Sequence, residues 1–123
     1  DAVSDYTDGR EHHEGREAIM KFLKGALDRP VLTMHQGHHP EITVTGETTA
    51  VGRWALEDYV ITPRNRGVQC AAFYDDEYAK VGGQWKIKAT GYRLVYRQMW
   101  DRNETTSLKL TDRMHQPSSW EGH

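Results

Sequence analysis

Three histidines lie close together near the end of the first third of the chain, at His35, His38 and His39. Side chains alternate between the two faces of a strand, so His35 and His39 would share one face and His38 would take the other. An ordinary imidazole exchanges a proton near neutral pH, which makes His35 a candidate general base. The pattern also permits a non-catalytic alternative, in which one histidine packs at a subunit contact and the other two lie in solvent.

Asp58 is the second candidate, because it falls in a run of alternating apolar residues. Trp54, Leu56 and Val60 share its phase, which places the carboxylate on the apolar side of a strand. A carboxylate there must be paired or hydrogen-bonded, or its pKa rises. Asp58 either orients and polarises a catalytic histidine or is a buried aspartate bonded to backbone amides or an arginine. We expect it to meet His35 inside one cavity.

A metal site at the histidine cluster is a further alternative. Structural zinc sites normally draw on cysteine or on histidines at helical spacing, and Asp58 is the only evident additional ligand. The prediction is therefore no metal and no cofactor. The single cysteine, Cys70, has no evident activating neighbour, and we expect a small buried residue there.

Aromatic residues and one arginine could line a pocket for an apolar ligand; the candidates are Trp54, Phe73, Tyr92 and Arg93. Such aromatics are often core residues instead. Arg93 could bind a substrate carboxylate or enolate, although surface ion pairing is the commoner role. Composition and spacing thus indicate a His/Asp acid–base site in a pocket.

One helix and several long strands must position these residues. An apolar stripe predicts a helix from Gly15 to Leu27. Alternation and turn residues predict the strands that follow, with a tight hairpin at Gly82-Gly83 and a bulge at Gly91: Val31 to His38, Glu41 to Val44, Thr48 to Thr62, Val68 to Val81 and Gln84 to Trp100. Asp1 to Glu14 reads as polar and turn-rich, and residues 104–123 as a polar tail.

This order of elements indicates an α+β fold with a curved antiparallel sheet. The 123 residues suit a single domain. One helix covers only part of one sheet face. We therefore expect two further features: helices that lie upstream of Asp1, and subunits that pack sheet to sheet.

The net charge of -2, with both signs interspersed, gives no footprint for nucleic acid or an anionic membrane. No apolar run approaches a membrane span, and no signal peptide is evident. A cytoplasmic location is the default expectation.

Four segments of the chain carry a resemblance to a known family: Met34-His35-Gln36-Gly37-His38-His39-Pro40-Glu41-Ile42, Glu47 to Asp58, Ala72-Phe73-Tyr74 and Thr90-Gly91-Tyr92. They resemble the SnoaL-like family of the nuclear transport factor 2-like superfamily. They are closest to its bile acid 7α-dehydratase branch, and more distantly similar to scytalone dehydratase. The similarity runs from about Asp1 to about His115.

The resemblance implies a cone-shaped α+β barrel, in which helices pack on a strongly curved mixed or antiparallel sheet and the pocket lies inside. It implies cofactor-free acid–base catalysis by His35 and Asp58, with Tyr6 polarising a substrate carbonyl. It also implies a homotrimer. The family's first helices, which carry a catalytic Tyr and Asp, would lie before Asp1. Its last-strand arginine falls at Leu94, one place after Arg93.

The expected function is a hydro-lyase, or a related isomerase or cyclase, acting on a small apolar oxygenated molecule. The substrate class would be a steroid-like or polyketide-like carbonyl compound. The alternative is a non-catalytic ligand-binding or assembly domain of the same fold, such as a ring-hydroxylating dioxygenase small subunit. Copurification with a larger iron–sulfur subunit would distinguish this alternative.

Overall fold

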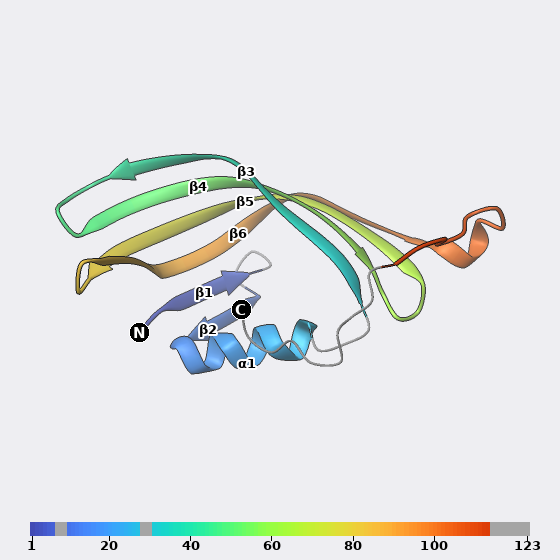
Figure 1. The fold of residues 1–123 in the computed structure, drawn as a ribbon, viewed down its shortest axis with the longest axis horizontal. Helices are drawn as coiled ribbons and strands as arrows, with labels where there is room; N and C mark the ends of the chain where they lie inside the picture. The colour runs from blue at the N-terminus through green and yellow to red at the C-terminus, as the bar shows by residue number, and fades with distance from the viewer. Residues whose placement is uncertain (7–9, 28–30, 114–123) are drawn as a thin grey trace.

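A computed structural model describes residues 1–6, 10–27 and 31–113 of the chain. Its described part contains one α-helix, six strands and a short 3-10 turn (Figure 1). Their bounds are β1 Val3–Tyr6, β2 Glu11–Glu14, α1 Arg16–Leu27, β3 Leu32–Val44, β4 Thr49–Ile61, β5 Arg66–Val81, β6 Gln84–Asp101 and η1 Arg102–Glu104.

The six strands form one sheet in the order β2-β1-β6-β5-β4-β3. Neighbouring strands are antiparallel except for β1 and β6, which pair in parallel. The long strands arch, and β1, β2 and α1 lie beneath the concave side of the arch (Figure 1). The α+β fold with a strongly curved mixed sheet is therefore confirmed.

Strand β3 joins two segments for which separate strands were expected. It runs without interruption from Leu32 to Val44, and its register against β4 shifts between His38 and Glu41. Pro40 is tolerated there because β3 is an edge strand, where a missing N–H need not break the ladder. His39 adopts a positive φ of 41°. The alternation that would place His35 and His39 on one face therefore does not continue past the bulge.

The N-terminal segment holds two strands, although turns were expected there. Both strands are only four residues long and largely polar, so no alternation of useful length marks them. Their pairing depends on β6, which lies far away in the sequence. The expected turn at Asp8-Gly9 lies outside the described residues, as do residues 114–123 of the tail.

Gly91 is not a bulge; that expectation was wrong. It pairs with Asp75 on one side and with Asp5 of β1 on the other. A Cβ at this position would overlap the backbone carbonyl oxygen of Asp5. The glycine is required because β1 approaches so closely. The pairing of β5 with β6 has two bulges elsewhere, and the unpaired extra residue on β6 is Lys88 in one and Val95 in the other.

The hairpin at Gly82-Gly83 has the expected geometry. The two glycines have φ angles of 58° and 79°, and a tight two-residue turn with both φ values positive matches the twist of the flanking strands.

No helix in the described residues has the length and apolarity to cross a membrane.

The core is small and centred on the sheet. Its most buried apolar residues are Ala50, Leu56, Val68, Cys70 and Ala72, which confirms the buried position expected for Cys70. Helix α1 has no fully buried residue. Ala18, Ile19, Phe22 and Leu23 of its apolar stripe are half-buried. The described helix therefore covers only part of the concave face, as one helix must.

Candidate functional site

Four chemically distinct side chains stand side by side across the concave face. His35 of β3 is paired in register with Asp58 of β4, Asp58 with Cys70 of β5, and Cys70 with Arg97 of β6. Residues directly opposite each other in antiparallel strands project to the same face. The row thus combines an imidazole, a carboxylate, a thiol and a guanidinium.

His35 is held between two neighbours by its two ring nitrogens. Its Nε2 lies 3.2 Å from Oδ2 of Asp58, and its Nδ1 lies 3.0 Å from the hydroxyl oxygen of Thr33. The expected contact between His35 and Asp58 is therefore present. The His35 side chain is 46% exposed and that of Asp58 only 15%, so the imidazole is accessible and the carboxylate behind it is shielded.

Asp58 is a carboxylate whose charge is only partly compensated. Burial raises its pKa, while the imidazole of His35 and the guanidinium of Arg97 act in the opposite direction. Its second oxygen, Oδ1, is buried without a hydrogen-bond partner among the described residues. The carboxylate of Asp58 therefore has room for a further hydrogen-bond donor or positive charge beside it.

Arg97 belongs to this row, although its position in the sequence does not predict it. Leu94 also faces the concave side, because it is paired with Ala72. Two residues three apart cannot share a face of a regular strand, but the bulge at Val95 reverses the alternation between them. No signal in the strand's own sequence marks this bulge, so pattern alone could not have placed Arg97 beside Asp58.

A cluster of tyrosines lies further along the same face. The rings of Tyr6 and Tyr92 stack at 5.4 Å, and Tyr6 also stacks on Phe22 of α1 at 5.9 Å. Tyr74 meets the ring of Tyr92 edge-on at 5.9 Å. Burial first, and then the charge of Asp76, raises the pKa of Tyr6. Tyr6 therefore links the concave face of the sheet to the helix beneath it.

Trp54 takes part in a chain of hydrogen bonds on this face. Its indole N–H donates to the Tyr78 hydroxyl at 2.9 Å, and that hydroxyl donates to Asp76 at 2.9 Å. The Thr90 hydroxyl donates to the other oxygen of Asp76 at 2.6 Å. Asp76 is thus satisfied by two neutral donors, and Trp54 is held in one orientation.

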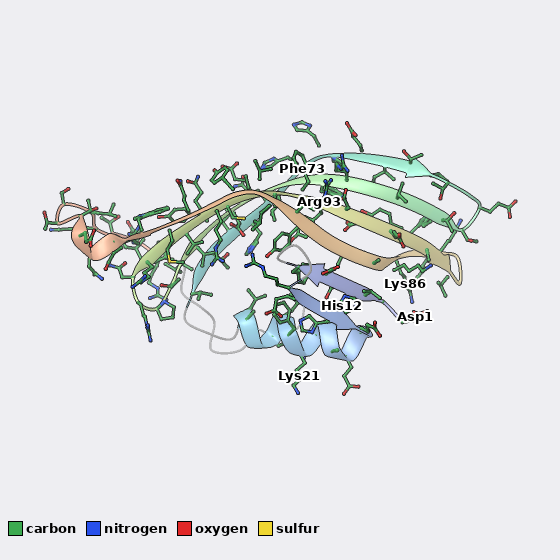
Figure 2. All side chains as sticks on the ribbon, turned by 180° about the vertical axis from the view of Figure 1, so that it is seen from behind. Asp1, His12, Lys21, Phe73, Lys86 and Arg93 are labelled. Atoms are coloured by element: carbon green, nitrogen blue, oxygen red, sulfur yellow. The ribbon has the colours of Figure 1, made fainter. Side chains whose placement is uncertain are left out.

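Phe73 and Arg93 lie on the convex face, away from His35 and Asp58 (Figure 2). Phe73 is 41% exposed. The Arg93 side chain is 62% exposed and donates through Nε to Asp75 at 2.8 Å, and Asp75 also accepts from Arg53 at 2.9 Å. The alternation of β5 and β6 separates these two residues from the concave row. Arg93 takes part in a surface ion pair.

A hollow of about 870 Å³ is lined by residues of β1, β3, β4, β5 and β6. Its lining includes the ion-pair residues Arg53, Asp75 and Arg93 of the convex face, whereas His35 and Asp58 are not part of it. The His35–Asp58 pair therefore lies outside this hollow. Across the described residues, no three histidine, cysteine, aspartate or glutamate side chains gather as a cation site.

Solved structures share this architecture. The hexachlorocyclohexane dehydrochlorinase LinA-type3 of Novosphingobium barchaimii LL02 matches with a TM-score of 0.72 at 20% identity, over 81% of this chain and 69% of that one. A candidate scytalone dehydratase of Novosphingobium aromaticivorans DSM 12444 matches with a TM-score of 0.71 at 26% identity, over 80% and 66% of the two chains.

A third structure, a candidate aromatic ring hydroxylase of Novosphingobium aromaticivorans, matches with a TM-score of 0.72 at 18% identity, over 87% and 75% of the two chains. At such low identities the dehydrochlorinase and the hydroxylase match in fold alone. The family model of the SnoaL-like domain matches residues 1–91, which is most of the chain. The protein belongs to the SnoaL-like domain family.

Proposed function

We propose that this protein is a cofactor-independent lyase that dehydrates a small carbonyl compound, or carries out a related isomerisation or cyclisation. The observation that supports this most directly is the pairing of the accessible His35 imidazole with the shielded carboxylate of Asp58 at 3.2 Å. In this proposal His35 is the general base, and Asp58 is the positioning residue that orients and polarises it.

The arrangement suits proton abstraction for an electrostatic reason. A histidine that removes a proton from carbon becomes an imidazolium, and the adjacent Asp58 carboxylate stabilises that charge as it forms. When the neutral ring carries its proton on Nε2, the nitrogen that faces Asp58, Nδ1 is the basic nitrogen. Thr33 then donates its hydroxyl to Nδ1, and an arriving substrate C–H displaces that contact.

The leaving group must depart from the carbon β to the carbonyl. Hydroxide is a poor leaving group, and the imidazolium of His35 can return its proton so that water departs instead. One related structure carries the name dehydrochlorinase and another that of a scytalone dehydratase. Loss of HCl and loss of water are both eliminations that a single base can start. We propose dehydration for this chain.

The proposed substrate is steroid-like or polyketide-like. The concave face offers the aromatic surfaces of Trp54, Tyr74 and Tyr92 on neighbouring strands, and such rings suit an apolar ligand with a few oxygen atoms. Tyr6 lies within the same cluster. Phe73 and Arg93 are left out of this proposal because they face the other way.

We further propose a homotrimer whose contacts cover part of the sheet. Several large apolar side chains of the sheet are highly exposed in one chain, and extended apolar surfaces of this kind are normally covered in an assembly: Met34, Ile42, Val44, Phe73 and Val95.

The test is to replace His35 by alanine and assay a panel of β-hydroxyketones for the conjugated enone product. A general base acts on the transition state, so kcat should fall by roughly 10² to 10⁴ while KM changes little. The matched control is His12→Ala, which removes an exposed histidine whose contact is Glu14 on its own strand. A His35→Ala enzyme with wild-type kcat ends the acid–base proposal.

A further inference from the structure

We propose that Tyr74 is the hydrogen-bond donor that binds the substrate's carbonyl oxygen and stabilises the enolate formed there. This inference rests on the proposed function and extends it from the base to the group that receives the developing negative charge. It assigns the role to a residue of the central strand β5 rather than to Tyr6.

The sheet places Tyr74 on the same face as the base. Tyr74 is paired with Trp54 on one side and with Tyr92 on the other. It lies four residues along β5 from Cys70, which is the register partner of Asp58. Four residues of strand span ~13 Å, and the curvature of the sheet turns side chains on its concave face toward one another. One ligand can therefore contact both groups.

Neighbouring packing holds the Tyr74 ring in place. It packs against the core cluster of Leu56, Cys70 and Ala72, and it meets the Tyr92 ring edge-on. Its hydroxyl makes no hydrogen bond to another described residue, although the residue is half-buried. A fixed ring with an uncommitted O–H is what a preorganised donor requires.

Two other tyrosines of this face, Tyr78 and Tyr6, are less suited to the role. The Tyr78 hydroxyl already accepts from Trp54 and donates to Asp76. Tyr6 is stacked between Tyr92 and the helix residue Phe22. The charges of both Asp58 and Asp76 act on the Tyr74 hydroxyl, and Tyr74 lies four residues along β5 from the register partner of Asp58. Tyr74 is thus the tyrosine that lies between the His35–Asp58 pair and the rest of the cluster.

Protonation of Tyr74 is favourable for donation. Burial first, and then the nearby Tyr6 hydroxyl, raises the pKa of Tyr74 to about 12. The phenol therefore keeps its proton at neutral pH and cannot compete with His35 as a base. It can still donate a strong hydrogen bond to an oxygen that is gaining negative charge.

The step balances without a further reactant. His35 takes the proton from the carbon next to the carbonyl, and the C–H electron pair forms a carbon–carbon double bond as the carbonyl π pair moves onto oxygen. The Tyr74 O–H holds that oxygen without transferring its proton. As the enolate re-forms the carbonyl, its carbon–carbon π pair moves to the bond between the α and β carbons and the bond from the β carbon to oxygen breaks. The hydroxyl leaves as water with the proton from His35.

The experiment compares wild type with Tyr74→Phe, Tyr6→Phe and Tyr96→Phe. Tyr96 is an exposed residue paired with Ala71 on the convex face, so its variant is the matched control. Two quantities are measured on each protein: kcat with the β-hydroxyketone panel, and the Kd of 2-naphthol by fluorescence. The naphtholate oxygen resembles an enolate oxygen, so its binding reports the donor without requiring turnover. Thermal melting verifies folding.

Tyr74→Phe should lower kcat by about 10²-fold or more and weaken 2-naphthol binding by about tenfold or more. Its melting temperature should stay close to wild type, because the ring packing is kept. Tyr96→Phe should match wild type in both quantities. Unchanged 2-naphthol affinity in Tyr74→Phe, or a larger loss in Tyr6→Phe, overturns the inference.

The two proposals can fail separately. Should wild type turn over no ketone while 2-naphthol binding still depends on Tyr74, the donor site stands and the lyase proposal is the one contradicted. Should wild type turn over a ketone and Tyr74→Phe keep its kcat, the assignment of Tyr74 is wrong and the lyase proposal survives.

Discussion

The imidazole of His35 and the carboxylate of Asp58 lie 3.2 Å apart across two neighbouring strands, at positions directly paired in the sheet. Neither residue is on a loop, so the two side chains start from a fixed backbone separation. Only the ring and the carboxylate must be oriented, and Thr33 contacts the other ring nitrogen. A site built on paired strands is more precise than one built on loops.

Asp58→Asn should lower kcat but cost less activity than His35→Ala, because the amide keeps the geometry and loses only the charge.

The same variant should gain stability relative to wild type as the pH rises. Burial raises the folded-state pKa of Asp58, so the folded chain keeps a proton that the unfolded chain releases above about pH 4. Wild-type stability therefore falls with rising pH across that interval, by ~1.4 kcal/mol per pH unit for one full proton.

Urea denaturation of both proteins from about pH 4 to pH 7 measures this difference. The free energy of unfolding of Asp58→Asn, minus that of wild type, should increase with pH and then level off. A difference that stays constant over the whole range would show that Asp58 titrates alike in the folded and unfolded chain.

Gly91→Ala should destabilise the protein by about 1–3 kcal/mol, because the new Cβ would overlap the carbonyl oxygen of Asp5. Strand β1 must then move away from β6, and Tyr6 moves with it. Gly25→Ala is the matched control, since nothing lies within 4 Å of a Cβ added there on α1. That helical substitution should stabilise by roughly 0.5–1 kcal/mol. Equal effects of the two substitutions in urea denaturation would contradict the close approach of β1.

Asp75→Asn should have only a small effect on stability, at most ~1 kcal/mol, because its ion pairs with Arg53 and Arg93 are exposed. Hydrogen bonds from the side chains of Arg53, which has the largest effect, and of Arg93 lower the pKa of Asp75. The stabilisation is therefore present above the ordinary carboxyl pKa of about 4 and is lost as the pH falls below it. High salt should reduce it as well.

Activity distinguishes this convex site from the concave one. If the chemistry lies on the concave face, Asp75→Asn and Arg93→Gln should both retain wild-type kcat and KM. A large fall in kcat with Arg93→Gln would place substrate on the convex face and would support the earlier interpretation of Arg93 as a substrate-binding residue.

The wild-type chain should be a trimer in solution at micromolar concentration, as measured by light scattering. Phe73→Glu should shift it toward smaller species, because it places a charge on the exposed convex face. The control is Met20→Glu on helix α1, another partly exposed apolar residue, which should leave the trimer intact. A stable wild-type monomer would contradict the proposal.

The sequence by itself predicted the features that depend on local alternation. The phase of Trp54, Leu56 and Asp58 predicted which side of β4 faces inward, and the two consecutive glycines predicted the hairpin after β5. The helix begins at Arg16, one residue after its expected start at Gly15, and ends at Leu27 as expected. Such features are readable because the periods of strands and helices are properties of a short stretch of chain.

The tertiary structure alone decided which residues of β6 and of the N-terminal segment reach the candidate site. Two bulges on β6 are set by how it pairs with β5, and each reverses the alternation of everything beyond it. For that reason Arg97 faces Asp58 while Arg93 faces solvent. Strand β1 likewise exists because β6 supplies its hydrogen bonds, and it brings Tyr6 to Tyr92. Pairing between strands distant in sequence leaves no periodic mark in either one.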